Sequence, residues 1–270
     1  MDANAERRSI FITGGGSGIG REVARYFGER GWFVGLADIN HEGMQETLAM
    51  IPHGFKYDCH LDVRDRDAWD GALEGFALAT GGRIDVVFNN AGIGHGGPLS
   101  EQGKDEIDAL IDVNLKGVVY GAQVAHPHLK KAGPNSVLIN TASLAGIIGA
   151  PNLSVYCATK WAVRGLTRSL DAEWAKDGIK VCALCPGFID TPIIEQTAPD
   201  SNQSVKESLV EAGVEVSPVS TVSTVVWDAV HGVKLDYTVG KSASRLLWLT
   251  RFMPGKVRKE MRKGGIGTEL

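Results

Sequence analysis

The sequence predicts one α/β domain built on a doubly wound parallel sheet that helices cover on both faces. Three observations lead to this fold class. Short apolar runs alternate along the chain with segments of helical periodicity. The runs are nearly continuous in apolar residues, which is typical of strands buried on both faces. The 270 residues suit one large domain and are few for two, so we expect a single domain over residues 1–270.

Six apolar runs are the expected strands, and five periodic segments are the expected helices. The strands are residues 9–13, 32–38, 55–63, 84–90, 136–143 and 179–187. The helices are residues 22–31, 41–50, 66–81, 104–133 and 156–178. Residues 191–220 show little apolar periodicity, so we expect a substrate loop there with one short helix over 205–213.

Composition argues against several classes of protein. The net charge is −4 and no basic tract interrupts the first 230 residues, which disfavours a nucleic-acid partner. The N-terminal residues lack the apolar core of a signal peptide, and no apolar run approaches the roughly 20 residues of a membrane span. Four scattered cysteines do not make a disulfide framework. We therefore expect a cytoplasmic protein.

No metal site is expected. Cys182 and Cys185 form a C-x-x-C inside the predicted strand 179–187, where residues three apart point to opposite faces. Such a pair cannot share a metal ion or make a compact redox centre, so we interpret both thiols as structural. The histidines show no spacing typical of metal ligands. His95 is set apart because it follows a predicted strand end, where it could face a substrate.

The run ITGGGSGIG, residues 12–20, predicts a site for a phosphate group. It joins a strand to a helix, and a helix N-terminus presents free N–H groups and a positive dipole end to an anion. Glycine permits close approach of a ligand to the backbone. The run fits neither G-x-G-x-x-G nor a nucleotide-triphosphate loop, so alone it indicates only a phosphate near a helix.

Asp38 narrows the ligand to a dinucleotide. It ends the strand that follows the glycine run, 18 residues beyond Gly20, where a carboxylate can accept hydrogen bonds from both hydroxyls of an adenosine ribose. The same carboxylate would repel a 2′-phosphate. The residues that might accept that phosphate are the uncharged Ile39 and Ser17. The sequence therefore favours NAD over NADP.

A second cluster of residues suits proton transfer. Tyr156 and Lys160 are four residues apart and so share one face of a helix. A tyrosine normally titrates near pH 10, and a neighbouring ammonium would lower that pKa toward neutrality. The same spacing is common on ordinary amphipathic helices. Two further residues favour function: Ser143 follows an apolar strand, and Asn114 interrupts an apolar helical segment.

Seven short motifs, taken in order, resemble the short-chain dehydrogenase/reductase family. They are TGGGSGIG (13–20), LDV (61–63), NNAG (89–92), VN (113–114), TAS (141–143), YCATK (156–160) and PGFIDT (186–191), and the resemblance covers about residues 8–192. It implies a Rossmann-type fold, an NAD cofactor and a homodimer or homotetramer. It also implies that residues 8–190 hold the cofactor and the catalytic residues.

The resemblance assigns cofactor contacts residue by residue. Asp62 and Val63 would flank the adenine, the NNAG turn would lie along the cofactor, and the PGFIDT segment would border the nicotinamide. The full expected set is Gly14, Ser17, Gly18, Ile19, Gly20, Asp38, Ile39, Asp62, Val63, Asn90, Ala91, Gly92, Tyr156, Lys160, Pro186, Gly187, Ile189 and Thr191.

The resemblance also assigns the chemistry. Tyr156 would be the general acid in ketone reduction and the general base in alcohol oxidation. Lys160 would lower its pKa, Ser143 would orient the substrate oxygen, and Asn114 would hold a water in a proton relay. The expected activity is NAD-dependent interconversion of a secondary alcohol and a ketone. The alternative is a catalytically inactive NAD-binding sensor or scaffold, which would not need all four residues.

The expected substrate contacts are mostly apolar. They are Ser143, Leu144, Asn152, Leu153, Phe188, Ile193 and His95. Because no cation is well placed among them, we expect a small hydrophobic alcohol or ketone.

Residues 241–270 depart from the usual ending of the family and form a basic amphipathic segment. Residues 241–263 hold eight basic residues against one acid, Glu260, and Leu246, Leu249, Phe252 and Met253 recur at helical spacing. We favour a helical cover over the substrate cleft or a subunit interface. Peripheral contact with an anionic membrane and a partly disordered tail are the alternatives.

Overall fold

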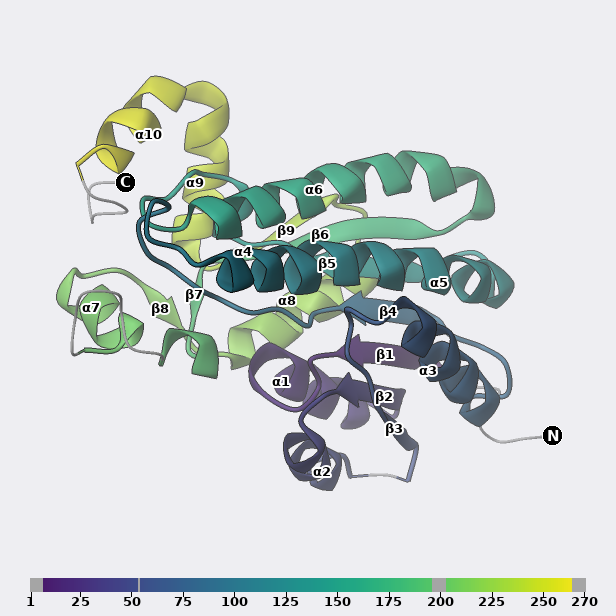
Figure 1. Cartoon of the computed structure of the whole chain (residues 1–270). Coiled ribbons are helices and arrows are strands. Elements are labelled where there is room, and N and C mark those ends of the chain that lie inside the picture. The colour runs from purple at the N-terminus through teal and green to yellow at the C-terminus, as the bar shows by residue number, and fades with distance from the viewer. Residues whose placement is uncertain (1–6, 53, 196–202, 264–270) are drawn as a thin grey trace.

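The computed structural model describes residues 7–52, 54–195 and 203–263. A central sheet runs through the molecule with helices above and below it (Figure 1). Parts of the predicted substrate loop (196–202) and of the C-terminal segment (264–270) lie outside the described residues.

The central sheet has seven strands, all parallel, in the order β3-β2-β1-β4-β5-β6-β9. The strands are β1 (Ser9–Thr13), β2 (Phe33–Asp38), β3 (Lys56–His60), β4 (Val86–Asn89), β5 (Val137–Thr141), β6 (Lys180–Pro186) and β9 (Asp236–Val239). The six predicted strands are confirmed, most of them with shorter ends. β9 was not among them, because four residues with alternating burial give too weak a signal.

Helices cover both faces of this sheet, as predicted. One face carries α1 (Gly18–Gly28), α2 (His41–Ala49) and α8 (Ser220–His231), and the other carries α3 (Arg66–Ala79), α5 (Gly117–Ala132) and α6 (Ser154–Trp174). Side chains of β1 show the alternation: Ile10 and Ile12 pack in the first layer and Phe11 in the second.

Smaller elements lie at the carboxyl edge of the sheet or beside it. They are α4 (Lys104–Ile111), a π turn (Asp112–Lys116), 3-10 turns at Leu144–Gly146, Ala175–Asp177 and Pro192–Ile194, α7 (Val205–Glu211), α9 (Lys241–Phe252), α10 (Pro254–Met261) and the paired short strands β7 (Phe188–Ile189) and β8 (Val216–Ser217). The single helix predicted over 104–133 is therefore divided at a π turn.

The strand order places a topological switch between β1 and β4. The chain moves outward from β1 to β2 and β3, then returns to pair β4 with the other side of β1. Ligands on doubly wound sheets bind at the carboxyl ends of the strands on either side of such a switch. The glycine run follows β1 and the NNAG turn follows β4, so both motifs border this crevice.

Candidate active site

The glycine run forms a turn that larger residues could not make. Gly14 and Gly18 have φ angles of +68° and +50°, in the left-handed region. A Cβ atom on Gly20 would lie 2.1 Å from the carbonyl oxygen of Gly14. The loop is therefore closed on itself, and α1 begins at Gly18, where its first N–H groups face the crevice.

Thr13 ties the glycine run to the NNAG turn. Its Oγ1 accepts hydrogen bonds from the backbone N–H groups of Asn90 and Ala91, each at 3.0 Å. The Asn90 side chain donates in turn to the Thr13 carbonyl at 2.9 Å. The glycine run and the NNAG turn therefore form one hydrogen-bonded unit. These contacts explain why Thr13 and Asn90 suit their places in the two motifs.

Asp38 lies against the glycine run at the end of β2. One carboxylate oxygen accepts from Gly16 N–H at 2.8 Å, and the other accepts from Asn40 N–H at 2.9 Å. The neighbouring Ile39 is 63% exposed and carries no charge. A carboxylate is therefore fixed at the rim of the crevice, where the sequence predicted it.

Arg21 is a basic residue beside this loop that sequence reasoning missed. Its guanidinium donates to the Gly16 carbonyl at 2.5 Å and pairs with Glu46 of α2 at 2.7 Å. Its Nε donates to Thr47 at 3.1 Å. Because its donors are turned to the loop backbone and to α2, Arg21 holds the loop in place. No motif in the sequence marks the Arg21–Glu46 contact.

Asp62 and Val63 follow β3 on the other side of Asp38. Two nitrogens of Arg64 form a bidentate pair with the Asp62 carboxylate, at 2.6 to 3.0 Å. This hydrogen-bonded pair lowers the pKa of Asp62. Val63 is buried, and its carbonyl accepts from the Trp69 indole at 3.1 Å.

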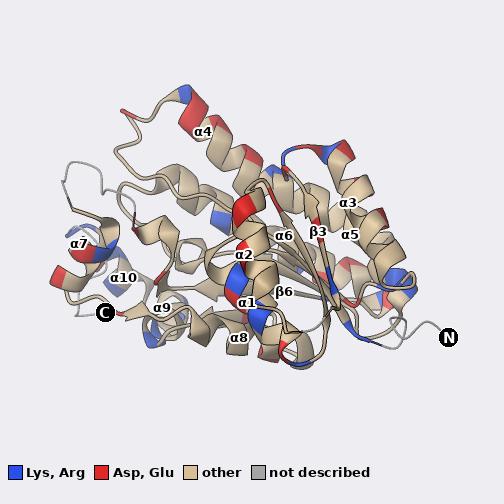
Figure 2. Ribbon diagram, turned by 90° about the horizontal axis from the view of Figure 1, so that it is seen from below, with Lys and Arg blue, Asp and Glu red and all other residues tan. Residues whose placement is uncertain are grey.

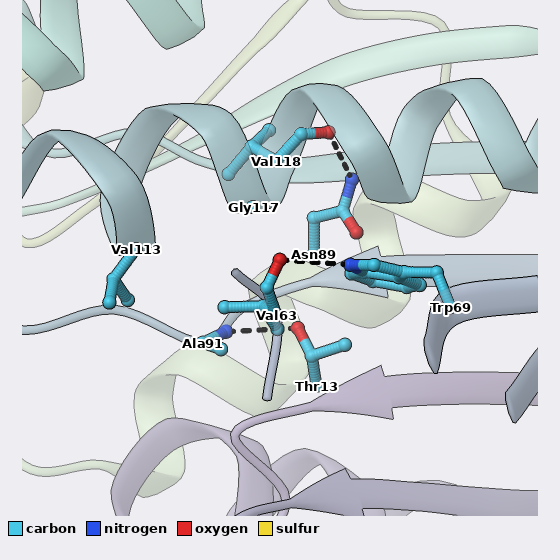
Figure 3. A pocket seen from close by; sticks show the side chains of 8 residues that line it. All are labelled: Thr13, Val63, Trp69, Asn89, Ala91, Val113, Gly117 and Val118. Atoms are coloured by element: carbon cyan, nitrogen blue, oxygen red, sulfur yellow. Dashed lines mark hydrogen bonds between the residues drawn. The ribbon is translucent and has the colours of Figure 1, made fainter. Parts of the chain in front are cut away.

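Beneath these loops lies a narrow gap too small for a water molecule. Figure 3 shows the side chains that converge on it, with Asn89 donating to the Val118 carbonyl at 3.3 Å. The lining residues are Thr13, Val63, Trp69, Asn89, Ala91, Val113, Gly117 and Val118. The floor of the crevice is thus closely packed, and a ligand would lie above it.

Ser143, Tyr156 and Lys160 come together beyond the end of β5. The Tyr156 phenol is hydrogen-bonded to Ser143. The Lys160 ammonium lies 5.6 Å from the centre of the Tyr156 ring and donates to the Thr141 carbonyl at 3.1 Å. Lys160 is buried. The helix α6 and the end of β5 therefore bring together three residues that are up to 17 positions apart in sequence.

Burial affects the pKa values of both Tyr156 and Lys160. Burial raises the pKa of Tyr156, and the hydrogen bond with Ser143 only opposes this rise. Burial lowers the pKa of Lys160 to about 8. Burial is thus the largest influence on both pKa values, and the lowering of the Tyr156 pKa by Lys160 stays a prediction.

Asn114 lies within the π turn and is fully buried. Its side-chain oxygen accepts from Ile93 N–H and its side-chain nitrogen donates to the Ile93 carbonyl, both at 2.9 Å. A π turn inside a helix is frequently found at functional sites. The polar residue in an apolar helix thus joins α4 and α5 to the loop after β4.

The expected nicotinamide border, from Pro186 to Thr191, faces the glycine run. Gly187 N–H donates to the Val239 carbonyl at 3.1 Å. Thr191 is buried, and a Cβ atom on Gly18 would lie 3.3 Å from its methyl group. This segment therefore crosses from the end of β6 to the start of α1.

Two of the expected substrate residues, Asn152 and Ile193, lie against the loop of residues 93–103, and His95 belongs to it. Gly97 N–H donates to the Asn152 carbonyl at 2.8 Å, and a Cβ atom on Gly94 would lie 3.0 Å from Ile193. His95 pairs with Glu106 at 3.1 Å. The others divide between surface and core: Ile193 is 44% exposed, Leu153 and Phe188 are half-buried, and Leu144 is buried in a core cluster.

Two further expectations concern metals and membranes. Among the described residues, no group of three or more His, Cys, Asp and Glu side chains could hold a metal ion, and no helix is long and apolar enough to cross a membrane. Cys182 packs in the layer of α8, whereas Cys185 packs in the cluster beneath α9. The two thiols thus lie on opposite faces of β6, as predicted, and burial raises the pKa of each to about 12.

A doubly wound sheet with a glycine run at its switch and a Ser-Tyr-Lys cluster defines a class of dehydrogenase, and comparison with known proteins agrees. Residues 8–202 match the model of the short chain dehydrogenase family. The chain belongs to this family of oxidoreductases.

Several relatives are similar over most of the chain. Meso-2,3-butanediol dehydrogenase of Serratia marcescens is 35% identical over 69% of this chain and 73% of that protein. Levodione reductase of Leifsonia aquatica is 34% identical over 78% and 80%. A crystal structure of levodione reductase superposes with a TM-score of 0.78 at 30% identity, covering 88% of this chain and 97% of that one.

A fold relative that carries a cofactor is also similar. The structure of 3-ketoacyl-(acyl-carrier-protein) reductase from Brucella melitensis complexed with NADH has a TM-score of 0.77 at 25% identity, covering 86% of this chain and 96% of that one.

Proposed function

We propose that this protein is an NAD-dependent oxidoreductase that interconverts a small hydrophobic secondary alcohol and its ketone. The observation that carries the proposal is the Ser143–Tyr156–Lys160 cluster beside a glycine run that Asp38 borders. The printed names of the relatives, a butanediol dehydrogenase and a levodione reductase, support an alcohol and ketone chemistry.

The residues of the crevice fit a dinucleotide. Cβ atoms at Gly14, Gly18 and Gly20 would press on Ala91, Thr191 and the Gly14 carbonyl, so the glycines keep the loop compact at the start of α1. A compact backbone turn at a helix N-terminus suits close approach of a pyrophosphate. Asp38 offers acceptors for the ribose hydroxyls and repels a 2′-phosphate. The NADH complex of the Brucella melitensis reductase supports the same ligand class. When bound, the nicotinamide supplies or accepts a hydride.

The chain's own residues move the proton. In ketone reduction, Tyr156 donates its phenolic proton to the substrate oxygen, and in alcohol oxidation it accepts that proton back. Ser143, hydrogen-bonded to the phenol, orients the same oxygen. Lys160 lies close enough to stabilise a phenolate.

Asn114 is the positioning residue of the set. Both polar atoms of its side chain are hydrogen-bonded to Ile93, and each has one further hydrogen-bonding position that could hold a relay water. Its side chain fixes the loop that leads to His95 and the substrate cleft.

The alternative function is a catalytically inactive NAD-binding sensor or scaffold. An enzyme needs all four of the residues Asn114, Ser143, Tyr156 and Lys160, and a scaffold does not. We further propose a cytoplasmic homodimer or homotetramer in which one domain carries both cofactor and substrate sites.

The test is hydride transfer by Tyr156→Phe. With a panel of hydrophobic secondary alcohols and NAD, we expect the wild type to form NADH and Tyr156→Phe to lower kcat at least about a hundredfold. NADH affinity, measured by fluorescence, should change little. Tyr26→Phe on α1, far from the cluster, is the matched control. A Tyr156→Phe enzyme with near-normal kcat would refute the assignment, and a wild type that binds NADH but turns over no alcohol would favour the scaffold.

A further inference from the structure

The C-terminal helices α9 and α10 each have one face against the body of the protein. Ala243, Leu246 and Leu249 of α9 and Val257 of α10 are buried in the core cluster that also contains Leu144. The helix is confirmed, but of the four apolar residues read at helical spacing only Leu246 and Leu249 are buried, whereas Phe252 and Met253 are exposed. The segment is thus firmly docked, close to the loop that follows Ser143.

The opposite face of α9 is exposed and aromatic. Trp248 and Phe252 are 55% and 60% exposed, and their rings lie 5.2 Å apart. Met253, 44% exposed, continues this apolar surface at the end of the helix. Lys241 and Arg245 fall on the same helical face, seven residues before Trp248 and Phe252 respectively. A surface of this kind is complementary to a partner that is both apolar and anionic.

Basic side chains surround this aromatic face. Figure 2 shows Lys and Arg along α9 and α10. Among the described residues, no acidic side chain lies within ion-pair distance of Arg245, Arg251, Lys256, Arg258, Lys259 or Arg262. Residues 241–263 carry a net charge of +7, whereas the rest of the chain carries −11. The surface is thus locally basic on an acidic protein.

We propose that the exposed face of α9, together with α10, docks on the surface of an anionic lipid bilayer. Trp248, Phe252 and Met253 would enter the boundary between headgroups and acyl chains, and the cations would pair with lipid phosphates. Neither helix could span the bilayer, so the contact is peripheral. The sequence alone favoured a cover or a subunit interface. The structure favours the membrane contact, because the face of α9 that packs on the protein and the exposed aromatic face lie on opposite sides of the helix.

The position of the two helices adds to the argument. α9, α10 and α7 lie toward the carboxyl ends of the strands (Figure 1), the end at which ligands bind to doubly wound sheets. Docking would therefore turn the substrate side of the molecule toward the bilayer. The binding itself does not depend on the proposed activity and can be tested without substrate.

The test is flotation of the full-length protein with lipid vesicles. We expect binding to vesicles of phosphatidylcholine mixed with phosphatidylglycerol, little binding to phosphatidylcholine alone, and release at high salt. W248A/F252A should weaken the partition at least about tenfold, and K256E/K259E should do the same by removing the charge attraction. The matched control is V233S/K234Q, which removes an exposed apolar residue and a cation from the opposite end of β9.

Two results would overturn the proposal. One is a wild type that does not float with anionic vesicles, or that floats as well after W248A/F252A. The other is a wild-type oligomer that W248A/F252A converts to monomers on size exclusion, which would make this face a subunit interface. Thermal unfolding of each variant shows whether the fold is kept, and K256E/K259E, at exposed positions, keeps the test valid if W248A/F252A unfolds.

Discussion

Arg164 and Asp236 form a largely buried ion pair that joins α6 to the last strand of the sheet. Two guanidinium nitrogens contact the two carboxylate oxygens at 3.1 and 3.0 Å, and the side chains are only 13% and 11% exposed. The third nitrogen donates to the Gly146 carbonyl at 2.8 Å. One side chain thus links β9, the helix of Tyr156 and Lys160, and the turn that follows Ser143.

Replacing Arg164 should cost much more stability than replacing its neighbour. Arg164→Met leaves the buried Asp236 carboxylate with Arg168 alone, and we expect a loss of about 3 kcal/mol in the free energy of unfolding. Arg168→Met removes a half-exposed partner of the same carboxylate, so the loss should be about 1 kcal/mol or less. Urea unfolding of both variants measures the difference. Equal losses in the free energy of unfolding would show that burial of the Arg164–Asp236 pair adds nothing to its contribution to stability.

The comparison of sequence and structure shows which kinds of feature a chain reveals. β1 was predicted from the five-residue run SIFIT, whose three central residues are apolar, because both of its faces are buried. β9 was missed because only alternate residues of its short run are buried. The π turn at Asn114 was also not predicted, although the misplaced polar residue drew attention to that position. Periodicity reports burial, and it does not report local changes of helix type.

The site shows the same division. Motif spacing identified Tyr156, Lys160 and Asp38, whose chemistry needs those residue types. Contacts between distant segments, such as Arg164 with Asp236 and Arg21 with Glu46, carry no local signal, because charged side chains of either sign are also common on exposed surfaces. The pKa of Tyr156 could not be predicted either, since it depends on burial that only the fold defines.

Gly20 should not tolerate a side chain, whereas Gly71 should. A Cβ atom on Gly20 would overlap the Gly14 carbonyl, so Gly20→Ala should open the glycine loop and weaken NADH binding at least tenfold. Gly71 lies inside α3, and a Cβ atom there would meet nothing within 4 Å. Gly71→Ala should therefore raise stability by about 0.5–1 kcal/mol. Nucleotide titration and urea unfolding test both, and an unchanged NADH affinity in Gly20→Ala would contradict the fit of the loop to a dinucleotide.

Asp38 should determine the choice between NADH and NADPH. Asp38→Asn keeps an acceptor for Gly16 N–H but removes the charge that repels a 2′-phosphate. We expect the preference for NADH to narrow by about tenfold or more, mainly through tighter NADPH binding. Glu42→Gln, which removes an exposed carboxylate in the first turn of α2, is the control and should leave the preference unchanged. Equal affinities of the wild type for the two nucleotides would make the assignment wrong.

Burial of Lys160 should make stability depend on pH in a defined window. Its pKa is about 8 in the folded protein and about 10.5 when exposed. Below pH 8 both states are protonated, and the full cost of the buried charge is present. Between pH 8 and pH 10 the unfolded state holds a proton that the folded state has lost, so stability rises with pH, by about 2–3 kcal/mol.

The difference in unfolding free energy between the wild type and Lys160→Met isolates this contribution, because the other titrating groups largely cancel. Tyr156 would act in the opposite direction, because its pKa is raised in the folded protein. The folded protein would keep the phenolic proton where the unfolded chain has lost it, which is only above about pH 10, so stability would fall there as the pH rises. Urea unfolding from pH 7 to pH 10 therefore reports on Lys160 alone. We expect the free energy of unfolding of the wild type to rise relative to that of Lys160→Met as the pH rises. A constant difference would mean that Lys160 keeps its proton in the folded protein throughout this range, and that its pKa in the folded protein is not lowered to about 8.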